Sequence, residues 1–235
     1  IFGDKATDAM NRLHASAVAI GETPARMVKN YIQSLDTLSQ YSGPKAISVF
    51  QGLSSMSKAL GVEMQTLVGV ANQFDTFESA AGSAAKLNAI LGGPYLNSIQ
   101  MLNASEDKKL SLLRGSLDAT NRSFEALGRF EKKAFAAAAG FQNLGTAAAF
   151  FKGNMSEVAE LTAKQERQDK AQQSLIESAS RLAPLIDRMA RFAERFGNQL
   201  ADTLLPYLEK FMTLLDRIGP IGFIVGKAFV GLAAN

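Results

Sequence analysis

Few side chains in this sequence are suited to acid–base, nucleophilic or metal chemistry. The chain has no cysteine and one histidine, His14, so thiolate nucleophiles, thiolate zinc sites and disulfides are excluded. Two carboxylate pairs have i, i+3 spacing, Glu157 with Glu160 and Glu166 with Asp169. A catalytic acid needs an apolar pocket, whereas these pairs lie in a charged stretch and are interpreted as solvated. His14 is interpreted as a surface or half-buried residue of a helix.

The sequence also lacks the loops that bind phosphates or metals. Gly92-Gly93 has no accompanying lysine and follows an expected helix, whereas a phosphate-binding loop follows a strand. No carboxylate cluster has the spacing of a metal loop. Basic and acidic residues alternate from Lys164 to Arg195, whereas a nucleic-acid groove carries one sign of charge. We therefore expect no enzyme activity, no catalytic residue, no metal, no cofactor and no sequence-specific nucleic-acid partner.

The composition predicts an all-α protein. The 235 residues are 47% hydrophobic, with a net charge of +3, so the chain can bury a core as one large domain or two small ones. Alanine and leucine, which favour helices, far outnumber the β-branched valine and isoleucine. No stretch alternates apolar and polar residues as a half-buried strand does.

Breaker residues divide residues 1–153 into a region of short helices. Gly21 and Pro24 separate the first two helices, and Gly43-Pro44 precedes a third over Lys45–Leu60. A longer helix is expected from about Glu63 to Leu91. Its core face is predicted to contain Phe74, Phe77, Ala81, Ala84, Leu87 and Leu91.

Capping residues predict two further helix starts in this region. Ser105 precedes two acidic residues, which suit the positive end of a helix, and Ser123 is expected to cap another helix. The core side of the helix after Ser105 is predicted to carry Leu110, Leu113 and Leu117.

Residues 154–217 are predicted to form a coiled-coil rod. Apolar and polar seam positions follow one another at alternating steps of three and four from Val158 to Leu200, which is the heptad rule. Two extra steps of four then form a stutter. A continuous helix here would have roughly 60 residues and a length of about 90 Å. The predicted self-association seam contains Leu175, Leu182, Ile186, Met189, Phe196, Leu200, Leu204, Leu208, Phe211 and Leu215.

Glutamines and prolines interrupt the predicted rod. Gln165, Gln168 and Gln172 occupy three successive seam positions, and a buried amide needs a hydrogen-bond partner. These layers are therefore either bonded across chains or hydrated; alternatively, the stretch faces water and the seam begins at Leu175. Pro184 and Pro206 each either kink one helix or begin a new one.

The last segment, residues 218–235, is apolar and rich in small residues. Its 18 residues fall slightly short of a transmembrane span, and Lys227 interrupts them. The segment either contacts a membrane or packs against protein. Its candidate membrane contacts are Ile221, Phe223, Ile224, Val225, Phe229 and Val230.

Residues 74–151 resemble a segment of tail tape measure proteins of tailed bacteriophages. The similarity lies in the turn KLNAILGGPYLN (Lys86–Asn97), the acidic capped helix from Ser105, and the helix LGRFEKKAFAAAAG (Leu127–Gly140). It covers about a third of the chain. A full tape measure spans the tail, so we expect this chain to be a segment of a longer one.

The resemblance implies a structural role in the virion and no enzyme activity. A tape measure fills the lumen of the tail tube, sets tail length during assembly, and leaves ahead of the DNA to help the genome cross the host envelope. The seam itself predicts association of three or more copies of the chain, with a trimer expected. The partners that the resemblance implies are the tail tube, the tail tip or baseplate hub, and the host membrane after release.

Two other classes of protein share some of these features. A pore-forming or membrane-acting helical toxin would conceal residues 218–235 until triggered, but it would not need a sixty-residue seam. A peptidoglycan-cleaving tail domain would need a catalytic acid that the sequence does not offer.

Overall fold

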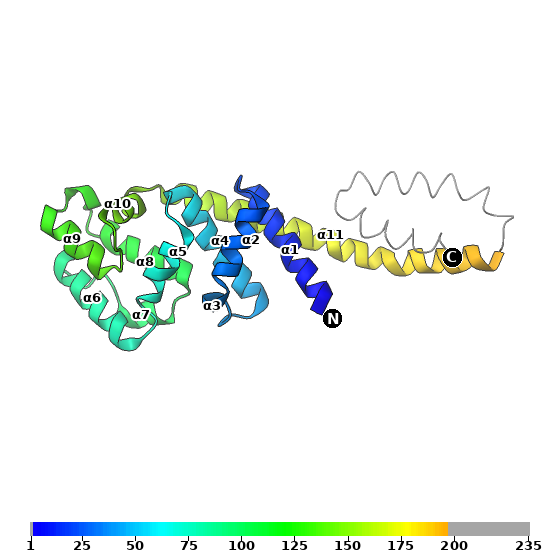
Figure 1. The fold of residues 1–235 in the computed structure, drawn as a ribbon, viewed down its shortest axis with the longest axis horizontal. Helices are drawn as coiled ribbons and strands as arrows, with labels where there is room; N and C mark the ends of the chain where they lie inside the picture. Colours follow the sequence, from blue (N-terminus) through cyan, green and yellow to red (C-terminus); the bar gives the residue numbers. More distant parts are fainter. Residues whose placement is uncertain (1, 197–235) are drawn as a thin grey trace. The chain divides into compact units, whose positions relative to one another are not determined.

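A computed structural model of the chain describes the backbone of residues 2–196 (Figure 1). It has two compact units, Ile1–Asp169 (unit 1) and Lys170–Asn235 (unit 2). Within residues 2–196 every regular element is helical, which confirms the all-α prediction. The elements are α1 (Phe2–Ala19), α2 (Pro24–Gln33), α3 (Leu35–Leu38), α4 (Gly43–Leu60), α5 (Met64–Asn72), α6 (Phe77–Leu91), α7 (Ser98–Asn103), α8 (Glu106–Asp118), the 3₁₀ turn η1 (Phe124–Ala126), α9 (Arg129–Ala138), α10 (Leu144–Lys152) and α11 (Met155–Phe196).

The first helix boundaries lie where the breakers predict them. Pro24 is the first residue of α2, and the side chain of Thr23 accepts a hydrogen bond from the Arg26 backbone N–H at 3.4 Å. α4 ends at Leu60 and is followed by Gly61, whose φ of 64° is left-handed and suits glycine. The starts expected after Ser105 and Ser123 are confirmed as α8 and η1.

The single helix expected from Glu63 to Leu91 is wrong, because α5 and α6 are separate. The Thr76 side chain accepts a hydrogen bond from the Ser79 backbone N–H at 3.2 Å and so caps a new helix. The turn between the helices buries Phe74 completely but leaves Phe77 63% exposed. Phe77 therefore does not belong to the predicted core face.

The core of unit 1 is built around α4 and α8. Helix α8 packs against both α4 and α5, and its predicted core residues Leu110, Leu113 and Leu117 are at most 1% exposed. On α4, Phe50 is fully buried and meets Tyr31 edge-on, with ring centroids 5.1 Å apart. Burial of such side chains is the main force that holds the short helices together.

Phenylalanines form a second part of this core. Phe151 contacts the rings of four other phenylalanines, with centroids 4.9–5.8 Å apart. Arg114 of α8 reaches the end of α10 and donates hydrogen bonds to the carbonyl oxygens of Phe150 and Gly153. Burial lowers the pKa of Arg114. The rings that meet Phe151 are Phe124, Phe135, Phe141 and Phe150.

Unit 1 extends further along the chain than the sequence suggests. It ends at Asp169, whereas the predicted boundary lies between residues 153 and 154. The first part of α11 therefore packs with the short helices. Pro184 lies inside α11 and does not begin a new helix. Pro206 and the whole segment 218–235 lie outside the described residues.

Candidate self-association surface on helix α11

Helix α11 carries the described part of the predicted rod. It is 42 residues long, or about 63 Å at 1.5 Å per residue. The Asn154 side chain accepts a hydrogen bond from the Ser156 backbone N–H at 2.9 Å, and Glu157 lies in the first turn. Both features favour a helix start at this point. The helix carries many Ala, Glu, Lys and Gln residues, which lose little freedom in a helix.

The first seam residues pack against their own chain. Val158 is 5% exposed and belongs to the core of unit 1, and Leu161 is partly buried against that core. These positions therefore have an intramolecular partner already. At its start, the seam predicted from Val158 onward therefore packs α11 against the short helices of unit 1.

Gln165 is also buried within its own chain, which corrects its prediction as a layer between chains. It is 0% exposed, and its Nε2 donates to Ser55 Oγ at 2.9 Å and to the Gln51 carbonyl oxygen at 3.4 Å. Gln51 in turn donates to Ser16 Oγ at 2.9 Å. The amide at this seam position thus bonds to α4, and α4 bonds to α1.

One turn further along, an ion pair fastens α11 to α1. Arg12 Nε and one guanidinium NH₂ group each donate to one carboxylate oxygen of Asp169, both at 2.6 Å. The two side chains are only 9% and 12% exposed. Such a bidentate pair is strong and geometrically specific. The sequence-based interpretation of Asp169 as solvated is therefore wrong.

The described seam positions after Gln165 are more exposed than Gln165 itself. Gln168 is exposed, Gln172 is half-buried, and Leu175 is 42% exposed. An exposed leucine at a heptad position favours an interface with another helix. We define the candidate self-association surface, in the part of the chain described, as Gln168, Gln172 and Leu175.

The rest of the predicted seam is described only in part. The backbone of α11 is continuous through Leu182, Ile186, Met189 and Phe196, so their spacing puts them on one side of a helix with Leu175. Their side chains lie outside the described residues, as do the seam residues Leu200, Leu204, Leu208, Phe211 and Leu215. The same holds for the candidate membrane contacts Ile221, Phe223, Ile224, Val225, Phe229 and Val230.

The remaining chemical candidates lie apart from one another. His14 is exposed on α1, and Glu157, Glu160 and Glu166 are exposed on α11. Glu160 accepts a hydrogen bond from Lys164, which is 2.8 Å away and lowers the pKa of that carboxylate. Among residues 2–196 no three acidic or histidine side chains are grouped as a metal site, and none of the helices is both long and apolar enough to span a membrane.

A buried carboxylate that the sequence did not indicate lies at the start of α8. Glu106 is 0% exposed, and its Oε1 accepts a hydrogen bond from Gln40 Nε2 at 2.9 Å. Lys109 lies 3.9 Å from the same oxygen and also pairs with Asp75. Burial, and then a hydrogen bond with Glu106, raise the pKa of Tyr41. The cluster ties the start of α8 to the residues that follow α3 and precede α6.

Comparison with known protein families, with curated proteins and with solved structures finds no match for this chain. The function proposed below therefore draws on the quoted sequence segments and on the geometry of α11.

Proposed function

We propose that this chain is part of a tail tape measure protein of a tailed bacteriophage. In this role it is a structural protein that occupies the lumen of the tail tube and sets tail length during assembly. It then leaves ahead of the DNA and helps the genome cross the host envelope. The similarity of residues 74–151 to such proteins supports the proposal, as does the all-helical character of the described residues.

The observation that carries the proposal is the division of α11 into two stretches. Residues up to Asp169 belong to unit 1, and the same helix continues to Phe196 in unit 2. On this second stretch a seam leucine, Leu175, is 42% exposed. A helix that continues past its own core with an apolar seam gains most by joining identical helices from other copies.

The assembled form follows from this surface. Chains associate along the seam, with three as the expected number, and leave their charged faces outward against the tail tube. Residues 218–235 are covered by protein in the virion, at the tail tip or baseplate hub, and reach the host membrane after release. The protein is thus located in the virion and, during infection, in the host envelope.

Deletion or duplication of one heptad tests directly whether the chain sets the length of the tail. In a phage that carries this chain, deletion of residues 172–178 should shorten the tail by about 10 Å, because seven helical residues rise about 10 Å. Duplication of the same heptad should lengthen the tail equally. The mean of many tails in electron micrographs gives the required precision.

A matched control keeps length constant. Replacement of residues 172–178 by a different heptad with the same seam positions should leave the tail unchanged. Unaltered tails after both the deletion and the duplication would contradict the proposal. If the purified chain also released the contents of lipid vesicles, the alternative function, a membrane-acting helical toxin, would be favoured.

A further inference from the structure

Helix α9 has one face that the core uses and one that it does not. Phe135, Ala136 and Ala138 are buried against the rest of unit 1, where α9 packs on α6 and α10. The opposite face carries Phe130, which is 83% exposed. Exposure of a phenylalanine ring to water is unfavourable, and contact with an apolar partner would relieve it.

The residues around Phe130 are apolar or positively charged. Ala134 and Ala137 are exposed along the same face as Phe130, and Arg129 and Lys133 are exposed on one flank of it. In the described part of the chain neither Arg129 nor Lys133 forms an ion pair, whereas Arg26, Arg122, Lys152 and Lys164 do.

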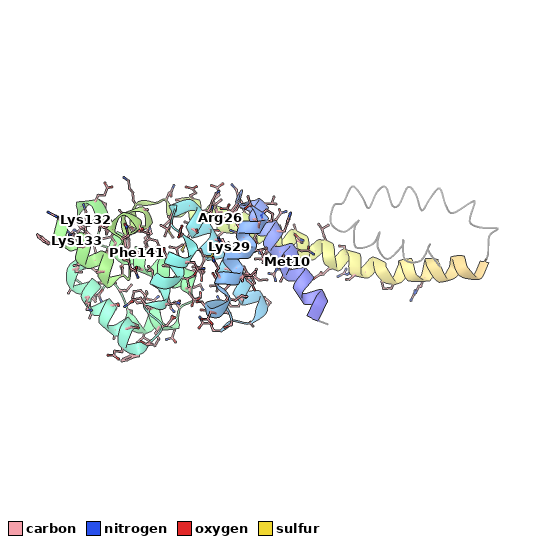
Figure 2. All side chains as sticks on the ribbon, viewed as in Figure 1. Met10, Arg26, Lys29, Lys132, Lys133 and Phe141 are labelled. Carbon is pink, nitrogen blue, oxygen red and sulfur yellow. The ribbon has the colours of Figure 1, made fainter. Side chains whose placement is uncertain are left out.

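The one carboxylate within α9 does not neutralise this face. Glu131 accepts a hydrogen bond from the Gly128 backbone N–H at 2.7 Å and another from Arg122 at 3.1 Å. It is thus committed to the start of the helix. Figure 2 shows Lys132 and Lys133 extending from α9 at the edge of unit 1.

We propose that the outer face of α9, formed by Arg129, Phe130, Lys133, Ala134 and Ala137, docks on an anionic phospholipid membrane. An exposed aromatic ring with flanking cations is the arrangement by which helices lie at a lipid interface: the ring enters the acyl boundary while the cations meet anionic headgroups. The inference extends the proposed function, since a released tape measure meets the host envelope. It rests on α9 alone and is separate from the segment 218–235.

The geometry favours lipid over other anionic partners. Phe130 is 83% exposed. A protein partner would have to supply a pocket for this ring, whereas the acyl boundary of a lipid layer accepts an aromatic ring without one. Binding of single-stranded nucleic acid uses several aromatic platforms in succession, and Phe130 is the one exposed aromatic residue of α9.

The chain contains no tryptophan, so one tryptophan placed at the site reports on that site alone. In the full chain, Phe130→Trp should give blue-shifted emission, quenched by brominated lipids, with vesicles of phosphatidylcholine and phosphatidylglycerol in a 3:1 ratio. Pure phosphatidylcholine vesicles should give no shift. The matched control is Val18→Trp, at a position on α1 that is 59% exposed, and its emission should not change.

A second experiment tests the role of the two cations by reversing their charge. Arg129→Glu with Lys133→Glu, introduced into the Phe130→Trp chain, should weaken vesicle binding at least tenfold, with an unchanged helical circular dichroism spectrum. Unshifted emission of the Phe130→Trp chain on anionic vesicles would overturn the proposal. This result would overturn it even if the chain bound to the vesicles, because binding would then occur through residues 218–235 alone. Equal binding by the charge-reversed chain would also overturn it, as would a blue shift with single-stranded DNA but not with vesicles.

Discussion

The ion pair between Arg12 and Asp169 is expected to contribute strongly to the stability of the packing of α11 on α1. Asp169→Ala leaves the Arg12 guanidinium buried beside the gap that the carboxylate filled. Removal of one partner of a buried pair costs about 3–5 kcal/mol, so we expect the free energy of unfolding of unit 1 to fall by about that amount. Urea denaturation followed by circular dichroism measures the change.

An exposed ion pair on the same helix provides the control. Glu160 and Lys164 lie 2.8 Å apart with side chains that are 66% and 49% exposed, and such pairs contribute little. Glu160→Ala should therefore have little effect. Equal effects of the Asp169 and Glu160 substitutions would show that the Arg12 pair is not the buried attachment described here.

The lowered pKa of Glu131 predicts that the stability of the protein depends on pH. The backbone hydrogen bond from Gly128, with a smaller contribution from Arg122, lowers the pKa of Glu131. A lowered folded-state pKa stabilises the protein above the unfolded-state pKa, about 4.3, and this contribution is lost as the pH falls through the folded-state value. Wild type should therefore be more stable than Glu131→Gln above that pH, with a difference that shrinks toward pH 3. A difference independent of pH, in denaturation curves recorded from pH 3 to 7, would contradict this.

At the scale of the elements, the cap at Thr76 separates α5 from α6. Its side chain accepts a hydrogen bond from the Ser79 backbone N–H, and loss of such a cap costs about 1 kcal/mol. Thr76→Ala should therefore lower the midpoint of thermal unfolding. Ser42 occupies the equivalent position of α4 but makes no side-chain cap bond, so Ser42→Ala is the matched control. If the two variants unfolded at the same temperature, the cap would not be what stabilises the start of α6.

The seam of α11 makes a second prediction at this scale. Leu182→Lys or Ile186→Lys would put an unpaired charge between associated helices, at a cost of several kcal/mol, and should abolish association. Ser180→Lys adds the same charge at an exposed position of the same helix and should leave association intact. Sedimentation velocity distinguishes these results, and an unchanged sedimentation coefficient for Leu182→Lys would argue against the seam.

Local signals in the sequence located most helix ends, because glycine, proline and capping residues act within a few positions. They missed the turn after α5, where the apolar spacing of Phe74 and Phe77 continues a helical pattern that a cap overrides. They also missed the ion pair of Arg12 with Asp169, whose partners are 157 residues apart in the chain. Heptad spacing does not distinguish a seam position that packs within a chain from one that packs between chains. Gln165 is a seam position that bonds within its own chain, whereas Leu175, further along the same seam, is exposed.

At the scale of the whole molecule, the proposed association supplies the partner that the outward seam lacks. Unit 1 buries its own apolar residues through α4 and α8, and it also takes up the first part of α11. Of the seam positions after Gln165 whose side chains are described, Gln168 and Leu175 are exposed and Gln172 is half-buried. We propose that copies of the chain share apolar contacts along this stretch.

Sedimentation equilibrium of the full chain tests that claim most directly. The chain has a mass of 25.2 kDa, and association along the seam predicts a concentration-dependent mass that rises to a whole multiple of this value, with three as the expected multiple. A mass of one chain at every concentration would contradict the proposed association.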